Sequence, residues 1–461
     1  MILRNKRRQE EDTAAEQTFP LTEMQKFMLP TLTDPDCVLR FKQFLYQVQG
    51  LRIKPGVTPR RIERGLKKLA KRHDVLRLAF RKSEDTDEWR GVFVPVDDIK
   101  LTVEDYGTMS PEDLRAKVRE VAEDTMEIDD EILTDFRMLR FGEEGDAILF
   151  RLHHALTDAF GMMVLVEDLV KFIINMPGTG EGYPYADFVQ KVEQKLPDHK
   201  GEAGAYWDDM LFPPPAPVNF GRVAKGLSME TDPHLIDNIR DASVTMPVED
   251  YETITEIAQK AGASMFTLTV AALNDTMHDM YGSDGIIGRS VMGRNAGDLS
   301  NFIGFALRFP LWRVDMSDGD TLIERAKTLR KQMQTSMTTI TKELGRPVNK
   351  IDERLRAETG GIGVQFFVHV PSADAKAKSS MLAGIFRSQG DVMMKVGPVE
   401  VERIALPRPP AMGAPNDLTV LVLPFDDGAQ VTVRCDGTVF DDDELQDIAN
   451  QLMGKLLSVK G

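Results

Sequence analysis

The sequence is poor in cysteine, in basic charge and in long apolar runs. Its two cysteines, Cys37 and Cys435, are far apart and have the spacing of neither a metal site nor a redox pair, as is typical of a protein in a reducing cytoplasm. The 57 lysine and arginine residues are outnumbered by 73 aspartate and glutamate residues, and the net charge of −16 argues against nucleic acid or an anionic membrane as the main partner. No segment approaches the roughly 18 apolar residues of a membrane span.

The N-terminus lacks a recognisable targeting signal. Residues 1–8 are rich in arginine and lysine, but residues 9–12 are polar or acidic where a signal peptide would continue with an apolar run. We therefore expect residues 1–18 to form a flexible tail and the protein to be cytoplasmic.

What the sequence does contain is a mixture of helical and strand-like patterns in both halves. With 461 residues and 42% hydrophobic content, the chain is long enough for two lobes with substantial cores. A stiff proline segment, Phe212 to Pro217, marks a linker. We predict an α/β protein with an N-terminal lobe over residues 19–220 and a C-terminal lobe over residues 221–461. The expected helices cover 20–32, 59–73, 110–126, 162–170, 251–261, 264–280, 321–338 and 442–457, and the expected strands cover 41–48, 75–80, 89–95, 147–152, 243–248, 285–291, 303–314, 363–370, 418–423 and 430–435.

The most informative motif is a pair of adjacent histidines, His153 and His154, followed four residues later by Asp158. The pair follows the predicted strand 147–152, so it stands at a strand end, where a neutral imidazole can accept a proton from a hydroxyl or amine. Neighbouring strand residues point to opposite faces, so only one of the two histidines can face a given cleft. No third nitrogen or sulfur ligand stands at a useful spacing, and we expect no metal site.

Several other segments occur in a recognisable order along the chain. They are Phe19 to Gln25, Arg72 to Phe80, His153 to Asp158, Tyr185 to Phe188, Tyr206-Trp207, Gly293 to Asn295 and Ile303 to Phe305. Together they resemble the condensation domains of nonribosomal peptide synthetases, over about residues 19–458. The resemblance implies two chloramphenicol-acetyltransferase-like lobes, arranged as a pseudo-dimer with the active site in a tunnel between them.

The resemblance also implies a reaction: transfer of an acyl group from a phosphopantetheine thioester to an amine or hydroxyl, forming an amide or ester in natural-product biosynthesis. The thioester arrives on an acyl or peptidyl carrier protein or as a coenzyme A ester, with no bound cofactor. No adenylation or carrier segment fits within this length, so we expect a free-standing enzyme. A monomer is adequate, because the two lobes already form a pseudo-dimer.

Within this family the motif implies unequal roles for its members. His154 meets the nucleophile, either as general base or by positioning it and stabilising developing charge. His153 and Asp158 are structural. Asp158 pairs with Arg77, caps the helix that begins near Gly161, or does both. Backbone N–H groups at that helix start are candidates for an oxyanion site.

The sequence departs from the family pattern at three positions. Ala159 replaces the usual glycine, which is tolerable only if its φ is negative, and Gly161 stands where a serine is common. Arg308 falls where many peptide-forming members have asparagine; it either reads an anionic acceptor or pairs with an acid across the lobe interface. Arg294, in the expected crossover loop, and Phe160 are further candidates for the acceptor site or tunnel, although apolar residues beside the motif also serve as ordinary core.

Two other functions share parts of this pattern. Wax-ester and lipid acyltransferases carry the same histidine motif, but the segment Arg72 to Phe80 and Tyr206-Trp207 favour the condensation type. A catalytically silent scaffold that docks carrier proteins is the alternative from another functional class, and the intact His154 and Asp158 argue against it.

Overall fold

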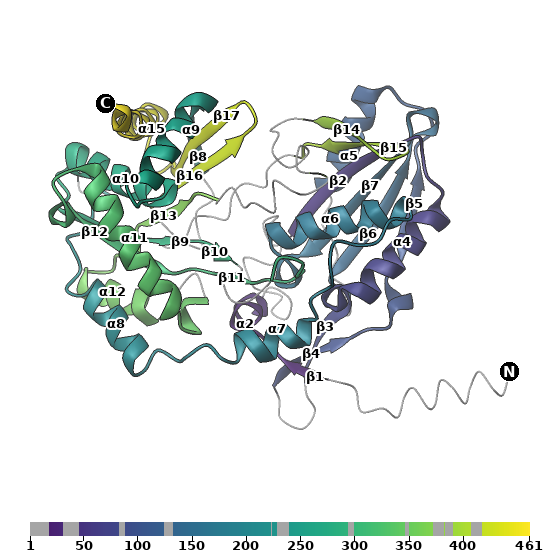
Figure 1. The fold of residues 1–461 in the computed structure, drawn as a ribbon, viewed down its shortest axis with the longest axis horizontal. Coiled ribbons are helices and arrows are strands. Elements are labelled where there is room, and N and C mark those ends of the chain that lie inside the picture. Colours follow the sequence, from purple (N-terminus) through teal and green to yellow (C-terminus); the bar gives the residue numbers. More distant parts are fainter. Residues whose placement is uncertain are drawn as a thin grey trace. The chain divides into compact units, whose positions relative to one another are not determined.

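The computed structural model describes residues 18–30, 46–82, 88–123, 132–222, 224–227, 239–293, 299–345, 350–371, 382, 391–406 and 417–461. The chain forms two compact units (Figure 1). Unit 1 consists of Met1–Pro35, Tyr46–Gln194 and Asn301–Phe305, and unit 2 of Asp36–Leu45, Lys195–Ser300 and Ala306–Gly461. No helix in the described ranges combines the length and the apolar character needed to cross a membrane.

Unit 1 is built on four neighbouring strands in the order β2-β7-β6-β5. Their bounds are β2 (Tyr46–Lys54), β7 (Asp146–His153), β6 (Thr134–Arg140) and β5 (Leu101–Asp105). β7 is antiparallel to both of its neighbours and every one of its residues is buried. A strand that is buried on both faces requires a near-continuous apolar run, and Ala147 to Phe150 supply it.

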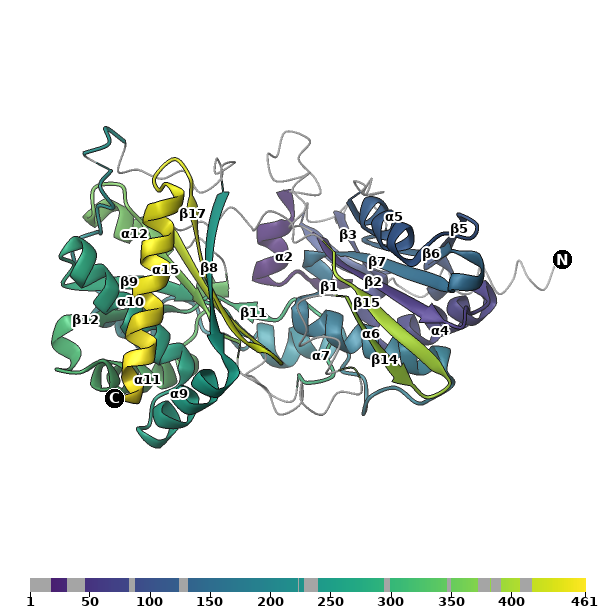
Figure 2. The ribbon, with the colours of Figure 1, turned by 90° about the horizontal axis from the view of Figure 1, so that it is seen from above.

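Helices surround these strands: α4 (Pro59–Arg72), α5 (Pro111–Glu123) and α6 (Ala159–Ile173). A second sheet of three short strands, β1 (Thr18–Pro20), β4 (Trp89–Phe93) and β3 (Leu78–Lys82), completes unit 1 together with the short helices α2 (Glu23–Met28) and α7 (Tyr185–Phe188). Figure 2 shows α5 and α6 on opposite sides of the strands. Thr18 already belongs to β1, so the part of the expected tail that precedes it, residues 1–17, lies outside the described residues.

Unit 2 contains a mixed six-stranded sheet in the order β12-β9-β13-β16-β17-β8. Its strands are β8 (Ile239–Pro247), β9 (Gly285–Ser290), β12 (Leu311–Asp315), β13 (Phe366–His369), β16 (Leu418–Phe425) and β17 (Gly428–Asp436). β13 runs parallel to β9 and β16, and the other neighbours are antiparallel. A further antiparallel pair of strands in this unit consists of β14 (Val392–Val396) and β15 (Val399–Ile404).

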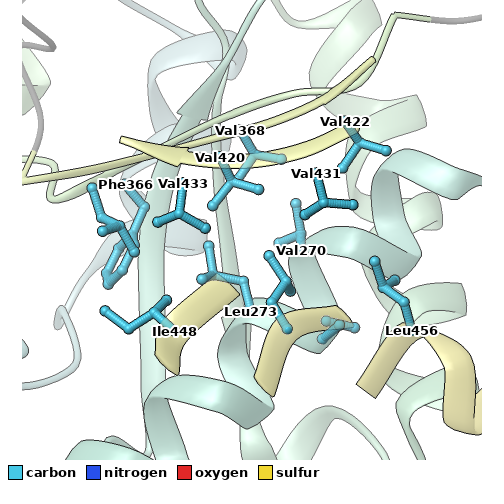
Figure 3. Close-up of a cluster of buried hydrophobic side chains, with 14 of the residues drawn as sticks. Val270, Leu273, Phe366, Val368, Val420, Val422, Val431, Val433, Ile448 and Leu456 are labelled. Carbon is cyan, nitrogen blue, oxygen red and sulfur yellow. The ribbon is translucent and has the colours of Figure 1, made fainter. Parts of the chain in front are cut away.

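The main core of unit 2 lies between this sheet and four helices: α9 (Val248–Lys260), α10 (Met265–Tyr281), α11 (Leu322–Thr338) and α15 (Asp442–Leu457). Figure 3 shows Val420, Val431 and Val433 pointing toward Leu273 and Ile448. A second apolar cluster joins β9 and β12 to α8 (Glu202–Leu211) and α12 (Lys350–Glu358). The helices α10, α11 and α15 each begin with a capping box; at α11 it is formed by Thr321 and Glu324.

The proline segment is a packed part of unit 2. The main chain of Val218 exchanges two hydrogen bonds of 2.8 Å with the Gln365 amide, and Arg313 donates to the carbonyl of Pro213 at 2.7 Å. The chain passes from unit 1 to unit 2 between Gln194 and Lys195, ahead of the expected boundary near residue 220.

Three predicted strands differ in the structure. The expected strand 41–48 overlaps only the start of β2, which continues to Lys54, and residues 41–45 lie outside the described residues. The expected strand 75–80 begins as a 3₁₀ turn, Asp74–Arg77, before β3. The expected strand 303–314 is interrupted: Asn301–Phe305 packs with unit 1, and β11 (Leu307–Arg308) and β12 follow as separate strands. Pro310 stands between β11 and β12, and its missing N–H prevents a continuous ladder.

Candidate functional site

The histidine motif forms a sharp connection between β7 and α6. His153 is the last residue of β7, His154 to Leu156 form a 3₁₀ turn, and Asp158 is the N-cap of α6. The prediction that the pair stands at a strand end is thus confirmed. The turn is buried throughout, with His153 fully inaccessible and His154 7% exposed.

Hydrogen bonds give the two imidazoles opposite tautomers. His154 Nδ1 lies 2.8 Å from the carbonyl oxygen of Thr157, which can only accept, so Nδ1 carries the proton and Nε2 has the lone pair. His153 Nδ1 accepts the N–H of Ala155 at 3.1 Å, so a neutral His153 carries its proton on Nε2. Only the His154 ring therefore presents Nε2 as a proton acceptor.

Both rings are held neutral by burial. Burial and the neighbouring His154 lower the pKa of His153 to about 3. Burial also lowers the pKa of His154, while the Asp158 carboxylate and the Thr157 carbonyl act in the opposite direction. A neutral imidazole with a free lone pair is the form that can accept a proton near neutral pH.

Asp158 shapes the start of α6. Its Oδ1 accepts the N–H of Gly161 at 2.8 Å and its carbonyl accepts the N–H of Met162 at 2.9 Å. These two N–H groups are therefore engaged and do not form an oxyanion site. Ala159 is the first helical residue and is not among the residues with positive φ, so its methyl group is accommodated without strain.

Arg77 does not pair with Asp158. Its guanidinium donates to the carbonyls of Ala70 at 3.1 Å and Val94 at 2.9 Å, and lies 5.1 Å from the ring centre of Phe93. Burial lowers the pKa of Arg77, opposed by the charge of Asp74. Of the two alternatives for Asp158, the structure shows the helix cap. Arg77 joins the end of α4 to β4.

The remaining predicted residues lie in different places. Phe160 is half-buried in the first turn of α6, and Gly161 is buried beside it. Arg308 lies in β11 of unit 2, 8% exposed, with Nη1 donating to the carbonyl of Leu307 at 2.9 Å. Arg294 and Cys37 lie outside the described residues. No cluster of three metal-ligating side chains occurs in the part of the chain that the structure describes.

Gln25 is a supporting residue whose role the sequence did not reveal. Its Nε2 donates to the carbonyl of Ala155 at 3.2 Å, and its Oε1 accepts the Tyr185 hydroxyl at 2.6 Å and the N–H of Thr22 at 3.0 Å. All of these groups are buried. The Gln25 amide thereby fixes the turn immediately after His154. In the sequence, the only indication of this role was the presence of a glutamine in the motif Phe19 to Gln25.

Asp168 anchors the middle of α6. It accepts hydrogen bonds from Arg72 and His73 at 2.8 Å each and from the N–H of Thr179 at 2.7 Å. Burial acts to raise the pKa of Asp168, but these bonds and the charges of His73 and Arg72 hold it below its ordinary value. Arg72 also donates hydrogen bonds from Nη2 to the carbonyls of Thr179 and Gly180. The segment Arg72–His73 therefore ties α6 to the following loop.

The segment Asn301–Phe305 packs against the His154 turn. The Phe305 ring lies 4.4 Å from the His154 ring, centre to centre, at an angle of 31°. Phe302 stacks on Phe188 at 4.5 Å. A Cβ at Gly304 would lie only 2.0 Å from the Phe302 ring, so the fold of this segment requires glycine there. Phe305 thus restricts the plane of the His154 imidazole.

Comparison with known proteins identifies this arrangement. Residues 15–458 match the family model described as Condensation domain. A linear gramicidin synthase of Brevibacillus parabrevis is 26% identical over 330 residues, which are 67% of this chain but only 6% of that protein.

Two solved structures have similar folds. The X-domain in its complex with OxyB from teicoplanin biosynthesis is 18% identical, with a TM-score of 0.68 over 97% of this chain and 94% of that one. The starter condensation domain of rhizomide synthetase RzmA, in complex with C8-CoA and Leu-SNAC, is 13% identical, with a TM-score of 0.68 over 96% and 95%. The two-lobed α/β fold expected from chloramphenicol acetyltransferase is thereby confirmed, and the chain belongs to the condensation-domain family.

Proposed function

We propose that the protein transfers an acyl group from a phosphopantetheine thioester to an amine or hydroxyl, with His154 at the reacting atoms. The observation that carries this proposal is the fixed tautomer of His154, whose Nδ1–H is bound to the Thr157 carbonyl. No hydrogen bond within the described residues engages Nε2, which is thus available to a substrate. The starter domain solved with C8-CoA and Leu-SNAC supports a thioester as the donor.

The chemistry follows from this geometry. The acceptor nitrogen or oxygen attacks the thioester carbonyl, a C–N or C–O bond forms, and the C–S bond breaks. His154 Nε2 accepts the proton of the nucleophile and passes it to the departing thiolate, which leaves as a thiol. An amine with a free lone pair needs this proton acceptor less than an alcohol does, so the contribution of His154 is greater for ester formation.

Donor and acceptor are proposed here only by class. A coenzyme A ester or a carrier-bound thioester provides the same phosphopantetheine arm, and the acceptor is a small amine or alcohol. Arg308 is proposed to bind an anionic group of the acceptor, because a guanidinium forms two parallel hydrogen bonds with a carboxylate or phosphate. We also propose that the protein acts in natural-product biosynthesis.

A second candidate function is docking without catalysis. The X-domain that resembles this chain was solved in a complex with OxyB, which favours a binding role for some members of the fold. The hydrogen bond from His154 Nδ1 to the Thr157 carbonyl, which fixes the tautomer, favours catalysis in this chain, because a docking scaffold does not require an oriented imidazole.

The test is release of free thiol from octanoyl-CoA and octanoyl-N-acetylcysteamine with a panel of amines and alcohols. We expect acceptor-dependent release by the wild type and a loss of about 10²–10⁴-fold in His154→Ala. His278→Gln, in α10 of unit 2, is the matched control and should retain the wild-type rate. Undiminished turnover in His154→Ala would refute the catalytic role, and absence of turnover in the wild type would favour docking.

A further inference from the structure

The outer face of α4 is basic in a chain that is acidic overall. Among its fourteen residues are seven lysines and arginines and one glutamate, a formal charge of 7 − 1 = +6, while the whole chain carries −16. By the same count α5 carries 3 − 4 = −1, and α9 and α15 each carry 1 − 4 = −3. The positive charge of α4 is therefore a local feature and does not reflect the general composition.

The exposed basic residues of α4 form a single stripe. They recur at helical spacing on the face opposite Ile62, Leu66 and Leu69, which are buried. At 1.5 Å per residue the stripe is about 16 Å long, or three turns of helix. We call this set the α4 stripe; its members are Arg60, Arg64, Lys67, Lys68 and Lys71.

Most of this charge is not neutralised within the protein. Lys67 pairs with Asp97 at 2.7 Å, and Glu63 lies on the same helix. Lys68 Nζ lies 5.9 Å from the centre of the Phe172 ring. Arg60, Arg64 and Lys71 make no ion pair or side-chain hydrogen bond with any other residue that the structure describes. A solvated helix surface ordinarily mixes both signs, so an uncompensated stripe points to an acidic partner.

The class of partner follows from charge and burial. Nucleic acid is disfavoured by the net charge of −16, which repels a polyanion beyond the local contact. An anionic membrane would take up the apolar face of an amphipathic helix, but that face of α4 is already packed against α6 (Figure 1). A rigid protein surface with acidic side chains at helical spacing matches a straight stripe three turns long.

We propose that the α4 stripe docks the acidic helical face of the carrier protein that delivers the thioester. The identity of this partner rests on the proposed function, whereas the acidic character of the surface it presents rests on the stripe alone. Complementary charge accelerates encounter and fixes orientation, and a globally acidic enzyme needs such a local patch to receive an acidic protein.

The stripe lies on α4, which packs against α6, the helix that follows the His154 turn. Arg61 donates to the carbonyl of Ile173 at the end of α6, and Arg72 binds Asp168 in its middle. A Cβ at Gly65 would lie 3.4 Å from Leu169 of α6. A carrier protein bound to α4 would therefore contact the helix that packs against α6, and α6 is the helix that Asp158 caps.

The test compares two double variants of equal charge. Arg64→Glu/Lys71→Glu reverses two stripe residues, and Lys327→Glu/Lys331→Glu reverses two exposed lysines of α11; each changes the net charge by the same four units. The probe is an acidic bacterial holo carrier protein with a fluorophore on its phosphopantetheine thiol, followed by anisotropy at low and high salt. We expect the stripe variant to bind about tenfold more weakly and with a smaller salt dependence, and the α11 variant to bind like the wild type.

Two further measurements separate the possible failures. Turnover of the N-acetylcysteamine thioester should be equal in all three proteins, since it bypasses docking; if none turns it over, the proposed function fails while the binding result still decides the docking proposal. Equal carrier binding by both double variants, or no binding by the wild type, overturns the docking proposal. So does stripe-dependent binding to phosphatidylserine vesicles in place of the carrier protein.

Discussion

The two units use buried polar residues for different purposes. In unit 1 several of them converge on one turn and one helix: Gln25 binds the Ala155 carbonyl, Asp158 caps α6, and Asp168 accepts hydrogen bonds from Arg72, His73 and Thr179. In unit 2 the sheet and four helices enclose an apolar cluster, and the Arg222–Asp417–Gln365 group secures the proline segment. A buried polar group is costly without its partner, so the unit 1 network specifies one geometry, whereas an apolar core mainly supplies stability.

The largest expected effect is a loss of stability without a loss of activity. Leu273→Ala, in the unit 2 core, should lower the free energy of unfolding by about 2–5 kcal/mol, because it leaves a cavity among fully buried side chains. Thiol release by the folded protein should stay close to that of the wild type. Urea unfolding and thiol release on the same samples measure both quantities.

Gln25→Leu is the counterpart in unit 1. It removes a partner of the Ala155 carbonyl and of the Tyr185 hydroxyl, which should lower stability by about 1–3 kcal/mol while turnover falls more than it does in Leu273→Ala. If Gln25→Leu loses stability but keeps full turnover, the buried network of unit 1 has no part in orienting His154.

A smaller effect should appear as pH dependence. The pKa of His153 is about 3 in the folded protein and about 6.5 in the unfolded chain, so below pH 6.5 the unfolded chain takes up a proton that the folded protein does not. The stability contribution of neutral His153 is complete above pH 6.5 and falls by about 2 kcal/mol between pH 6.5 and 5. His153→Gln should flatten this part of the stability curve in denaturant unfolding.

His369 offers the comparison in unit 2. Burial lowers its pKa to about 4, so its contribution has the same sign and is lost as the pH falls from 6.5 toward 4. His369→Gln should flatten the same interval without changing thiol release. An unaltered slope in both variants would contradict the neutral burial of these rings.

The smallest effect concerns the helix caps. Asp158→Ala and Thr321→Ala each remove a side chain that accepts an N–H in the first turn, of α6 and α11 respectively, and each should cost about 1 kcal/mol. Only the first should also reduce turnover, because α6 begins beside His154. Thermal unfolding and thiol release distinguish the two, and equal turnover would show that the α6 start is not coupled to the site.

Much of the architecture could be predicted because its signals are local. The helix predicted over 264–280 is found at Met265–Tyr281, since the Ser264 cap, the apolar periodicity and Gly282 all lie within the segment. The histidine turn was predicted equally well from the apolar run before it. In contrast, β5 and β6 were not predicted, because their half-buried alternation is interleaved with charged residues that match no single period.

The contacts of the site could not be read from the sequence in the same way. Asp158 was expected to pair with Arg77, to cap the following helix or to do both. In the structure Arg77 is held by two backbone carbonyls, and Asp158 caps its own helix. Both outcomes satisfy the charges, so charge pattern alone does not choose between them. Phe305 is 151 residues from His154 in sequence, and no local pattern indicates that their rings meet.

The sequence by itself determined the family, the strand–turn–helix that carries His154, and the basic character of α4, because each is fixed by residues close together in the chain. The tertiary structure alone decided which imidazole has its lone pair on Nε2, that Asp158 caps a helix, and that Gln25 and Phe305 support the turn. These are choices among hydrogen-bond and ring partners, and burial favours one of them because a buried polar group without a partner is costly.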